Sequence, residues 1–203
     1  MRIMRWDNLF DDLESQLEHE LGVEDLELRI EEERLRLGRL SLRERLRAAS
    51  DAEPGAGATV RLWLVDGSLV RLRVATFGRD WMAGVIGEEG EASTRAIVPL
   101  DAVGSVGLDP ARLHASLDAD DPGPDAAPRL IDRLGLAFAL RDLARRRTAV
   151  TVVTRAGALH GTIDRVARDH LDLALHEPGV PRRATEVRGI RIVPMAAIVL
   201  VRI

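Results

Sequence analysis

The stretch that decides the fold runs from residue 156 to residue 198 and contains three short segments, A-G-A-L (156–159), V-A-R-D-H-L (166–171) and I-V-P-M-A-A-I (192–198). Closely similar segments occur earlier in the chain, as D-G-S-L (66–69), F-G-R-D-W-M (77–82) and I-V-P-L-D-A-V (97–103). The matched glycines, Gly67 and Gly157, are 90 residues apart. A repeat of about this length is too long for a solenoid unit and predicts two small domains of similar fold.

The composition is that of a globular protein with an aliphatic core. Of the 203 residues, 46% are hydrophobic but only 3% are aromatic. The absence of cysteine excludes disulfides and thiolate metal sites. The first nine residues lack an apolar signal core, and the longest apolar stretch, 192–201, is too short for a membrane span. We therefore expect a cytoplasmic protein that does not interact with a membrane.

Residues 1–50 are predicted to form an acidic helical segment, because residues 1–34 hold twelve acids and four arginines, a net charge of −8. An amphipathic helix is expected at its start, followed by a charged helix over about 24–37. The pattern Ser41 to Glu44 is a capping box that starts a short helix to about residue 49. The acidic face is either a solvated surface or a docking surface. The candidate partner-binding stripe consists of Trp6, Phe10, Leu13, Leu17 and Leu21.

Residues 58–108 are predicted to form a first small β-barrel. Val60, Leu62 and Leu64 alternate with Arg61 and Trp63, which is the period of a strand with one buried face. Asp66-Gly67 is a hairpin signal, and further strands are expected near 68–76, 81–87, 93–98 and 103–107. Five short strands in about fifty residues suit a small closed barrel, which removes its edges by curling.

The second repeat has the same order. Residues 109–128 are rich in Asp, Ala, Pro and Gly and are expected to be a flexible linker. Residues 129–203 are expected to hold a helix to about residue 146 and a second small barrel. Its strands are placed near 149–155, 158–166, 170–176, 186–193 and 197–202. The predicted class is therefore α+β, mainly β, with two five-stranded barrels that each follow a helix.

A helix followed by five short strands resembles the Sm-like family, which includes the Sm, LSm and Hfq proteins and has an SH3-like barrel. Residues 157–163, G-A-L-H-G-T-I, resemble the G-x-L-x-G-x-apolar strand of that family. Residues 170–175 resemble its third strand, and Val193-Pro194 resembles the break before its fifth. The resemblance implies open-edged units that pair strand four with strand five of a neighbour, and hence a homo-oligomer.

The uridine pocket of the Sm-like family has an aromatic residue or His, then Met-Asn, at the start of the third strand. The matching positions here read Trp81-Met82-Ala83 and His170-Leu171-Asp172. A ring that stacks on a base is retained in each repeat, which makes Trp81 and His170 candidate nucleic-acid contacts. The family's Asn is replaced, however, and Asp172 would repel phosphate. The family's RNA-binding set is therefore not carried over intact.

The sharpest basic cluster lies at the end of the helix predicted over 129–146. Positive charge is favourable at a helix C-terminus, which is one explanation of the cluster. The other explanation is a phosphate-binding patch, which Arg155, Arg182 and Arg183 would extend. The candidate phosphate contacts are Arg141, Arg145, Arg146 and Arg147.

We predict no enzymatic activity, no cofactor and no metal. The sequence contains no phosphate-binding loop, nucleophile elbow or dinucleotide fingerprint. His160, Asp164, His170, Asp172 and His176 are close in sequence, but strand alternation scatters them over two faces.

Two functions stay open. One is a non-catalytic scaffold that binds an unknown protein partner. The other is an RNA- or DNA-binding regulator that uses the barrel loops and the arginine cluster. The acidic balance of the chain favours the scaffold, because the acidic segment would repel the phosphates that the arginines attract.

Overall fold

The computed structural model describes residues 25–52, 59–87, 93–118, 129–180 and 182–203. Met1–Ser41 and Leu42–Ile203 are two compact units, and each is taken by itself. In the first unit, residues 25–39 form a helix, which confirms the predicted charged helix, whereas the stripe from Trp6 to Leu21 lies outside the described residues. No helix within the described ranges combines the length and the apolar character needed to cross a membrane.

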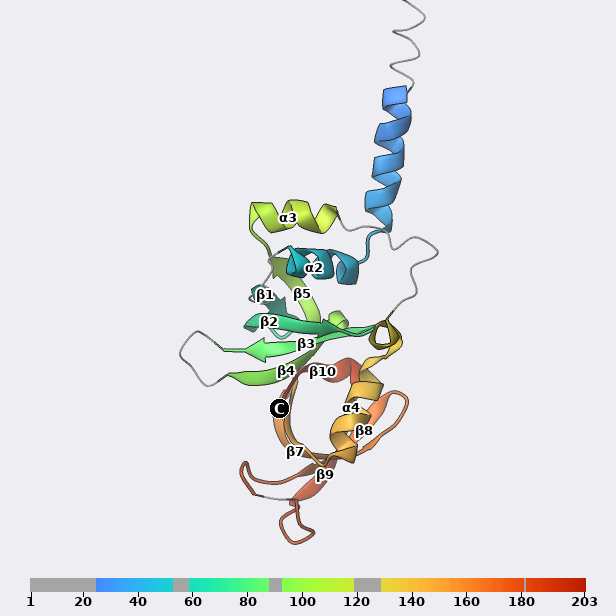
Figure 1. Ribbon diagram of the computed structural model, residues 1–203. Helices are drawn as coiled ribbons and strands as arrows, with labels where there is room; N and C mark the ends of the chain where they lie inside the picture. The colour runs from blue at the N-terminus through green and yellow to red at the C-terminus, as the bar shows by residue number, and fades with distance from the viewer. Residues whose placement is uncertain (1–24, 53–58, 88–92, 119–128, 181) are drawn as a thin grey trace, which may run out of the picture. The chain divides into compact units, whose positions relative to one another are not determined.

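The first half of the sheet confirms the strands expected between residues 58 and 108. Its strands are β1 (Thr59–Leu64), β2 (Leu69–Phe77), β3 (Trp81–Ile86), β4 (Thr94–Pro99) and β5 (Val103–Gly107) (Figure 1). Every second residue of β1 is buried and the others are exposed, as the alternation predicts. Gly67, in the turn between β1 and β2, has a φ of 85°, which side-chain-bearing residues rarely adopt.

The second half repeats this order after an intervening helix. Its strands are β6 (Ala149–Thr154), β7 (Gly157–Val166), β8 (His170–Leu175), β9 (Gly189–Pro194) and β10 (Ile198–Arg202). Short 3-10 turns precede the last strand of each half, Leu100–Ala102 in the first and Met195–Ala197 in the second. The prolines that mark the repeat, Pro99 and Pro194, immediately precede these turns.

The described strands form one open antiparallel sheet of ten, in the order β5-β1-β2-β3-β4-β10-β6-β7-β8-β9. β4 does not return to β5 of its own half but pairs with β10, through the contacts Val201 to Ile97 and Arg202 to Ala96. The expectation of two separate closed barrels is therefore not confirmed. A strand has only two edges, so the joint between β4 and β10 takes the edge that closure of the first half would use.

Two hydrophobic cores support the sheet, and each contains residues of both halves. The first core lies mainly between α2 (Leu42–Asp51) and the strands of the first half, but it also includes Val199 and Leu200 of β10. The second core lies under β6 to β10, but it also includes Trp81 and Ile97 of the first half. The halves thus share their cores as well as their sheet.

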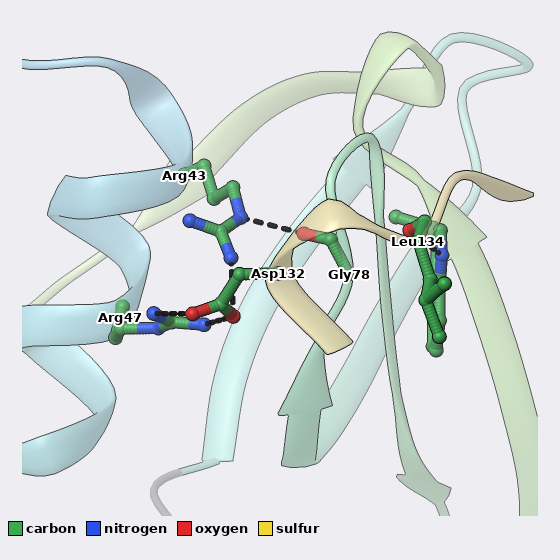
Figure 2. A network of polar contacts seen from close by, with 6 residues as sticks. Arg43, Arg47, Gly78, Asp132 and Leu134 are labelled. Atoms are coloured by element: carbon green, nitrogen blue, oxygen red, sulfur yellow. Dashed lines mark hydrogen bonds and ion pairs between the residues drawn. The ribbon is translucent and has the colours of Figure 1, made fainter. Parts of the chain in front are cut away.

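α2 and the following helix α3 (Pro110–Leu117) cover the first half. α2 buries Leu46 and Ala49, and its Arg43 and Arg47 both form ion pairs with Asp132 (Figure 2). The side chain of Arg45 donates to Ser116 of α3 at 3.1 Å. α2 thus belongs to the compact unit that begins at Leu42 rather than to the acidic segment.

The presence of α3 corrects the expectation of a flexible linker over 109–128, at least for its first part. Asp109 caps the helix by accepting a hydrogen bond from the backbone N–H of Arg112 at 3.0 Å. Pro110 occupies the first helical position, where its missing N–H costs nothing. Asp109 and Pro110, which add to the linker-like composition of this range, thus form the start of a helix. The rest of that range, 119–128, lies outside the described residues.

The helix predicted over 129–146 is divided in two. A 3-10 turn spans Leu130–Arg133, and α4 spans Leu136–Arg145. The division falls at Gly135, which supplies no side chain to cap α4. The carboxylate of Asp80 supplies the cap instead, because its Oδ1 accepts the backbone N–H of Leu136 at 2.7 Å. A residue of the first half thus positions the helix of the second.

Candidate functional site

The repeated Arg-Asp pairs of the two halves line one cavity of about 390 Å³ beside the joint between β4 and β10. Arg79-Asp80 lies in the turn between β2 and β3, and Arg168-Asp169 lies in the turn between β7 and β8. Other charged residues of the lining are Arg155 and Asp101. The apolar part of the lining comprises Val65, Pro99, Ala102, Leu136, Ala137, Met195, Ala196 and Ile198. We call this feature the joint cavity.

Equivalent backbone hydrogen bonds hold the two Arg-Asp turns in place. The carbonyl of Asp80 accepts the N–H of Leu100 at 3.0 Å, and the carbonyl of Asp169 accepts the N–H of Met195 at 2.7 Å. Each turn is therefore tied to the 3-10 turn of its own half. Because the pairing of β4 with β10 joins the halves, the Arg-Asp turn and the 3-10 turn of each half face the same cavity.

The acids of the joint cavity are more fully engaged than its arginines. Asp80 accepts from Leu136 and from Arg79, the latter at 3.2 Å. The hydrogen bond from His170 lowers the pKa of Asp169, so that this carboxylate is charged at neutral pH. Arg155 and Arg168 make no hydrogen bond or ion pair with any other described residue, and both are exposed.

The joint cavity contains the groups of an anion-binding site. Its lining provides guanidinium groups, carboxylates and apolar side chains. Two guanidinium groups without protein partners suit an anionic group of a ligand. The sequence does repeat the Arg-Asp pair, but this repetition indicated only that the halves are related, not that the two pairs share a cavity.

The two candidate stacking rings lie in different surroundings. Trp81 is only 5% exposed, belongs to the second core, and donates its indole N–H to the carbonyl of Leu134 at 3.0 Å. A ring this little exposed is mainly a core residue, and it offers little surface to a base from solvent. The His170 side chain is 43% exposed and hydrogen-bonds Asp169 at 2.8 Å. The fold does not bring the two rings together in one site.

The arginine cluster divides into three kinds of position. Arg141 donates to the carbonyls of Val166 and Ala167 at 3.4 Å, close to the turn that leads to His170. Arg145 and Arg146 both hydrogen-bond the same carboxylate, Asp142.

The hydrogen bond from Arg145, and to a smaller extent that from Arg146, lowers the pKa of Asp142. Arg147 is exposed at the end of α4. Much of the local positive charge is thus balanced on the helix itself. Arg182 does not extend the cluster, since it forms a two-bond ion pair with Asp164.

Two of the three histidines of the second half, His160 and His176, form a pair. His160 and His176 meet edge to face with ring centroids 5.4 Å apart, and each hydrogen-bonds a threonine, Thr151 and Thr162 respectively. Burial, followed by the nearby His176, lowers the pKa of His160. Within the described residues, no three His, Cys, Asp or Glu side chains converge as a metal ion would require.

Comparison with known proteins finds no matching family model, no curated protein of similar sequence and no solved structure of similar fold. Function is therefore inferred from the residues and their arrangement.

Proposed function

We propose that this protein is a non-catalytic interaction protein that assembles through the open edges of its sheet. The observation that carries the proposal is the pairing of β4 with β10, which joins the fourth strand of one half to the fifth strand of the other. This is the pairing that the Sm-like resemblance implies between neighbouring units. The two halves would then be two such units fused in one chain.

The ends of the sheet provide the complementary pair of strands. β5, the fifth strand of the first half, and β9, the fourth strand of the second, each have one neighbour in the sheet. β9 also exposes apolar side chains, with Ile190 61% and Ile192 70% exposed. An uncovered strand edge with apolar side chains favours association with another chain. β9 of one copy would pair with β5 of the next, which gives a ring if the rotation closes.

Light scattering of the full-length protein tests this assembly. The wild type should have a mass above that of one chain, and Ile192→Lys should shift the population to single chains, because a charge on an edge strand opposes pairing. Leu130→Lys is the matched control, since Leu130 is 75% exposed but lies in a 3-10 turn away from both edges. A wild type that stays a single chain at high concentration, or a control that dissociates equally, contradicts the proposal.

A second candidate function is nucleic-acid binding, and one observation favours it. Arg155 and Arg168 present guanidinium groups in the joint cavity, which is built from the turns between strands. Titration of the protein with single-stranded RNA at increasing salt tests this function, because phosphate contacts give a steep salt dependence. Arg155→Gln with Arg168→Gln should weaken binding, whereas Arg145→Gln with Arg146→Gln should change it less, since Asp142 already pairs with both. No binding at physiological salt, or equal loss in both variants, argues against a site in the joint cavity.

A further inference from the structure

A second cavity, of about 400 Å³, lies between the first half of the sheet and the helical elements of the second half. Strands β2, β3 and β4 line it on one side, and α4 with the preceding 3-10 turn lines it on the other. Its volume is within the range of small-molecule sites. We call it the sheet–helix cavity.

Small and apolar side chains create this space. Ala75, Ala83 and Ala139 line it where larger residues would fill it, and Ala75 sits at an irregularity in the pairing of β2 with β3. Trp81 forms a fixed part of the wall, because its indole N–H is bonded to Leu134. Phe138 of α4 also lines the cavity and is 53% exposed, which is unfavourable for a large aromatic ring in water. An apolar ligand would cover that ring.

One arginine lines this apolar space, and a second lies close to it in the sheet. In the register of the sheet, Val85 of the cavity wall is directly opposite Arg73 of β2 on one side and Arg95 of β4 on the other. Directly opposite residues point to the same face of the sheet. Arg95 lines the cavity, and Arg73 lies on the same face next to Val85, outside the lining itself. Neither makes a hydrogen bond or ion pair through its side chain with another described residue.

Negative charge does not balance these arginines from within the sheet. Strands β1 to β5 contain no Asp or Glu. The one acidic side chain in the lining of the cavity is Asp142, which already accepts hydrogen bonds from Arg145 and Arg146. Ile203, the last residue of the chain, also lines the cavity, and its N–H donates to the carbonyl of Arg95. An apolar cavity with Arg95 in its lining and Arg73 next to it, neither paired with a described residue, favours a ligand that has an apolar body and an anionic head.

We propose that the sheet–helix cavity binds a small amphiphilic carboxylate of the fatty-acid class. The hydrocarbon chain would lie against Phe138, Trp81 and the alanines, and the carboxylate would accept hydrogen bonds from Arg95 and Arg73. This goes beyond assembly through sheet edges, since it adds a ligand that neither β5 nor β9 contacts. It is also independent of the joint cavity, with which the sheet–helix cavity shares no lining residue.

Isothermal titration of the full-length protein with three ligands of equal chain length tests the proposal: decanoate, decanol and decyltrimethylammonium, all below their micellar concentrations. Decanoate should bind with a stoichiometry of one per chain. Decanol should bind roughly ten- to a hundredfold more weakly, because it forms no charge-assisted hydrogen bond with the guanidinium groups. The ammonium ligand should not bind. Equal binding of all three, or none by decanoate, overturns the proposal.

Two variants place the ligand in the cavity. Arg73→Gln with Arg95→Gln should reduce the affinity for decanoate to that for decanol, and Ala75→Leu should weaken both ligands by filling the space. Arg61→Gln is the matched control, because Arg61 is an exposed arginine of the same half that does not line the cavity. Unchanged decanoate binding in the double arginine variant would contradict the site even if Ala75→Leu fails to fold.

Discussion

At the scale of single residues, Gly161 has no room for a side chain. It lies in β7, where a Cβ would come within 2.2 Å of the carbonyl oxygen of Ala174 on the neighbouring strand. A backbone oxygen held in a strand pair cannot move aside as the end of a flexible side chain can. The close approach of the two strands thus depends on the absence of a side chain.

Gly161→Ala should therefore destabilise the protein by about 1–3 kcal/mol, through strain of the kind that overpacking produces. Gly189→Ala is the control, since a Cβ there meets nothing within 4 Å. Urea unfolding followed by circular dichroism measures both free energies of unfolding. Similar stability of the two variants would show that the strands are not as close at Gly161 as described.

Among the residues that the structure describes, Arg147 is the one non-glycine residue with a positive φ, which is 50°. Its N–H donates to the carbonyl of Ala144 at 3.0 Å in the turn that ends α4. Glycine is preferred at such helix ends, so Arg147→Gly should stabilise the protein by about 0.5–1 kcal/mol.

Arg146→Gly is the matched control for that substitution. Arg146→Gly should destabilise the protein, because Arg146 has helical dihedrals and its side chain donates a hydrogen bond to Asp142. Thermal unfolding measures both changes. A lower melting temperature for Arg147→Gly would count against strain at this residue.

At the scale of elements, one carboxylate connects two arginines of α2 to the rest of the unit. Asp132, in the 3-10 turn before α4, accepts hydrogen bonds from Arg43 and Arg47, and Arg43 also donates to the carbonyl of Gly78 (Figure 2). The hydrogen bond from Arg47, followed by its charge and that of Arg43, lowers the pKa of Asp132. The network ties α2 to the turn between β2 and β3 and to the start of the second half.

A depressed folded-state pKa means that this contribution to stability is present above the unfolded pKa of about 4 and is lost as the pH falls through the folded pKa. Asp132→Asn should lower the stability at pH 7 by about 1–3 kcal/mol, because two half-buried guanidinium groups lose their counter-ion. The difference between variant and wild type should shrink below pH 4. Urea titrations at pH 7 and pH 3 measure it, and an equal difference at both values would contradict the assignment.

At the scale of the whole molecule, the shared cores predict that the two halves unfold together. The first core takes in Val199 and Leu200 from β10, and the second takes in Trp81 and Ile97 from β3 and β4. Neither half keeps a complete core when the other unfolds. This arrangement differs from two domains on a flexible linker, which unfold separately.

Calorimetry of the full-length protein should therefore give one unfolding transition for residues 42–203. Leu46→Ala, in the first core, and Leu173→Ala, in the second, should each lower the same transition, at a cost of about 2–5 kcal/mol. Two transitions, each moved by only one of the variants, would contradict shared cores.

The sequence by itself determined the internal repeat and the strands of both halves, but not α3 or the division of the helix predicted over 129–146. Apolar side chains at a period of two in β1 and β2, and glycine in the turn after β1, are local signals, and local signals decide which residues become strands. The capping box at Ser41 likewise placed the start of α2. The composition of 109–128 predicted a linker, whereas its first part forms α3, because Asp and Pro are also favoured at a helix N-terminus.

Only the tertiary structure decided how the strands join and which residues form a site. The pairing of β4 with β10 rather than closure of each half is a contact between residues about 105 positions apart, such as Ile97 and Val201, and no local pattern specifies it. The same pairing brings the two Arg-Asp turns to one cavity and buries Trp81, which its sequence position suggested was a stacking ring. Burial and convergence depend on which surfaces meet, and that is settled when the cores form.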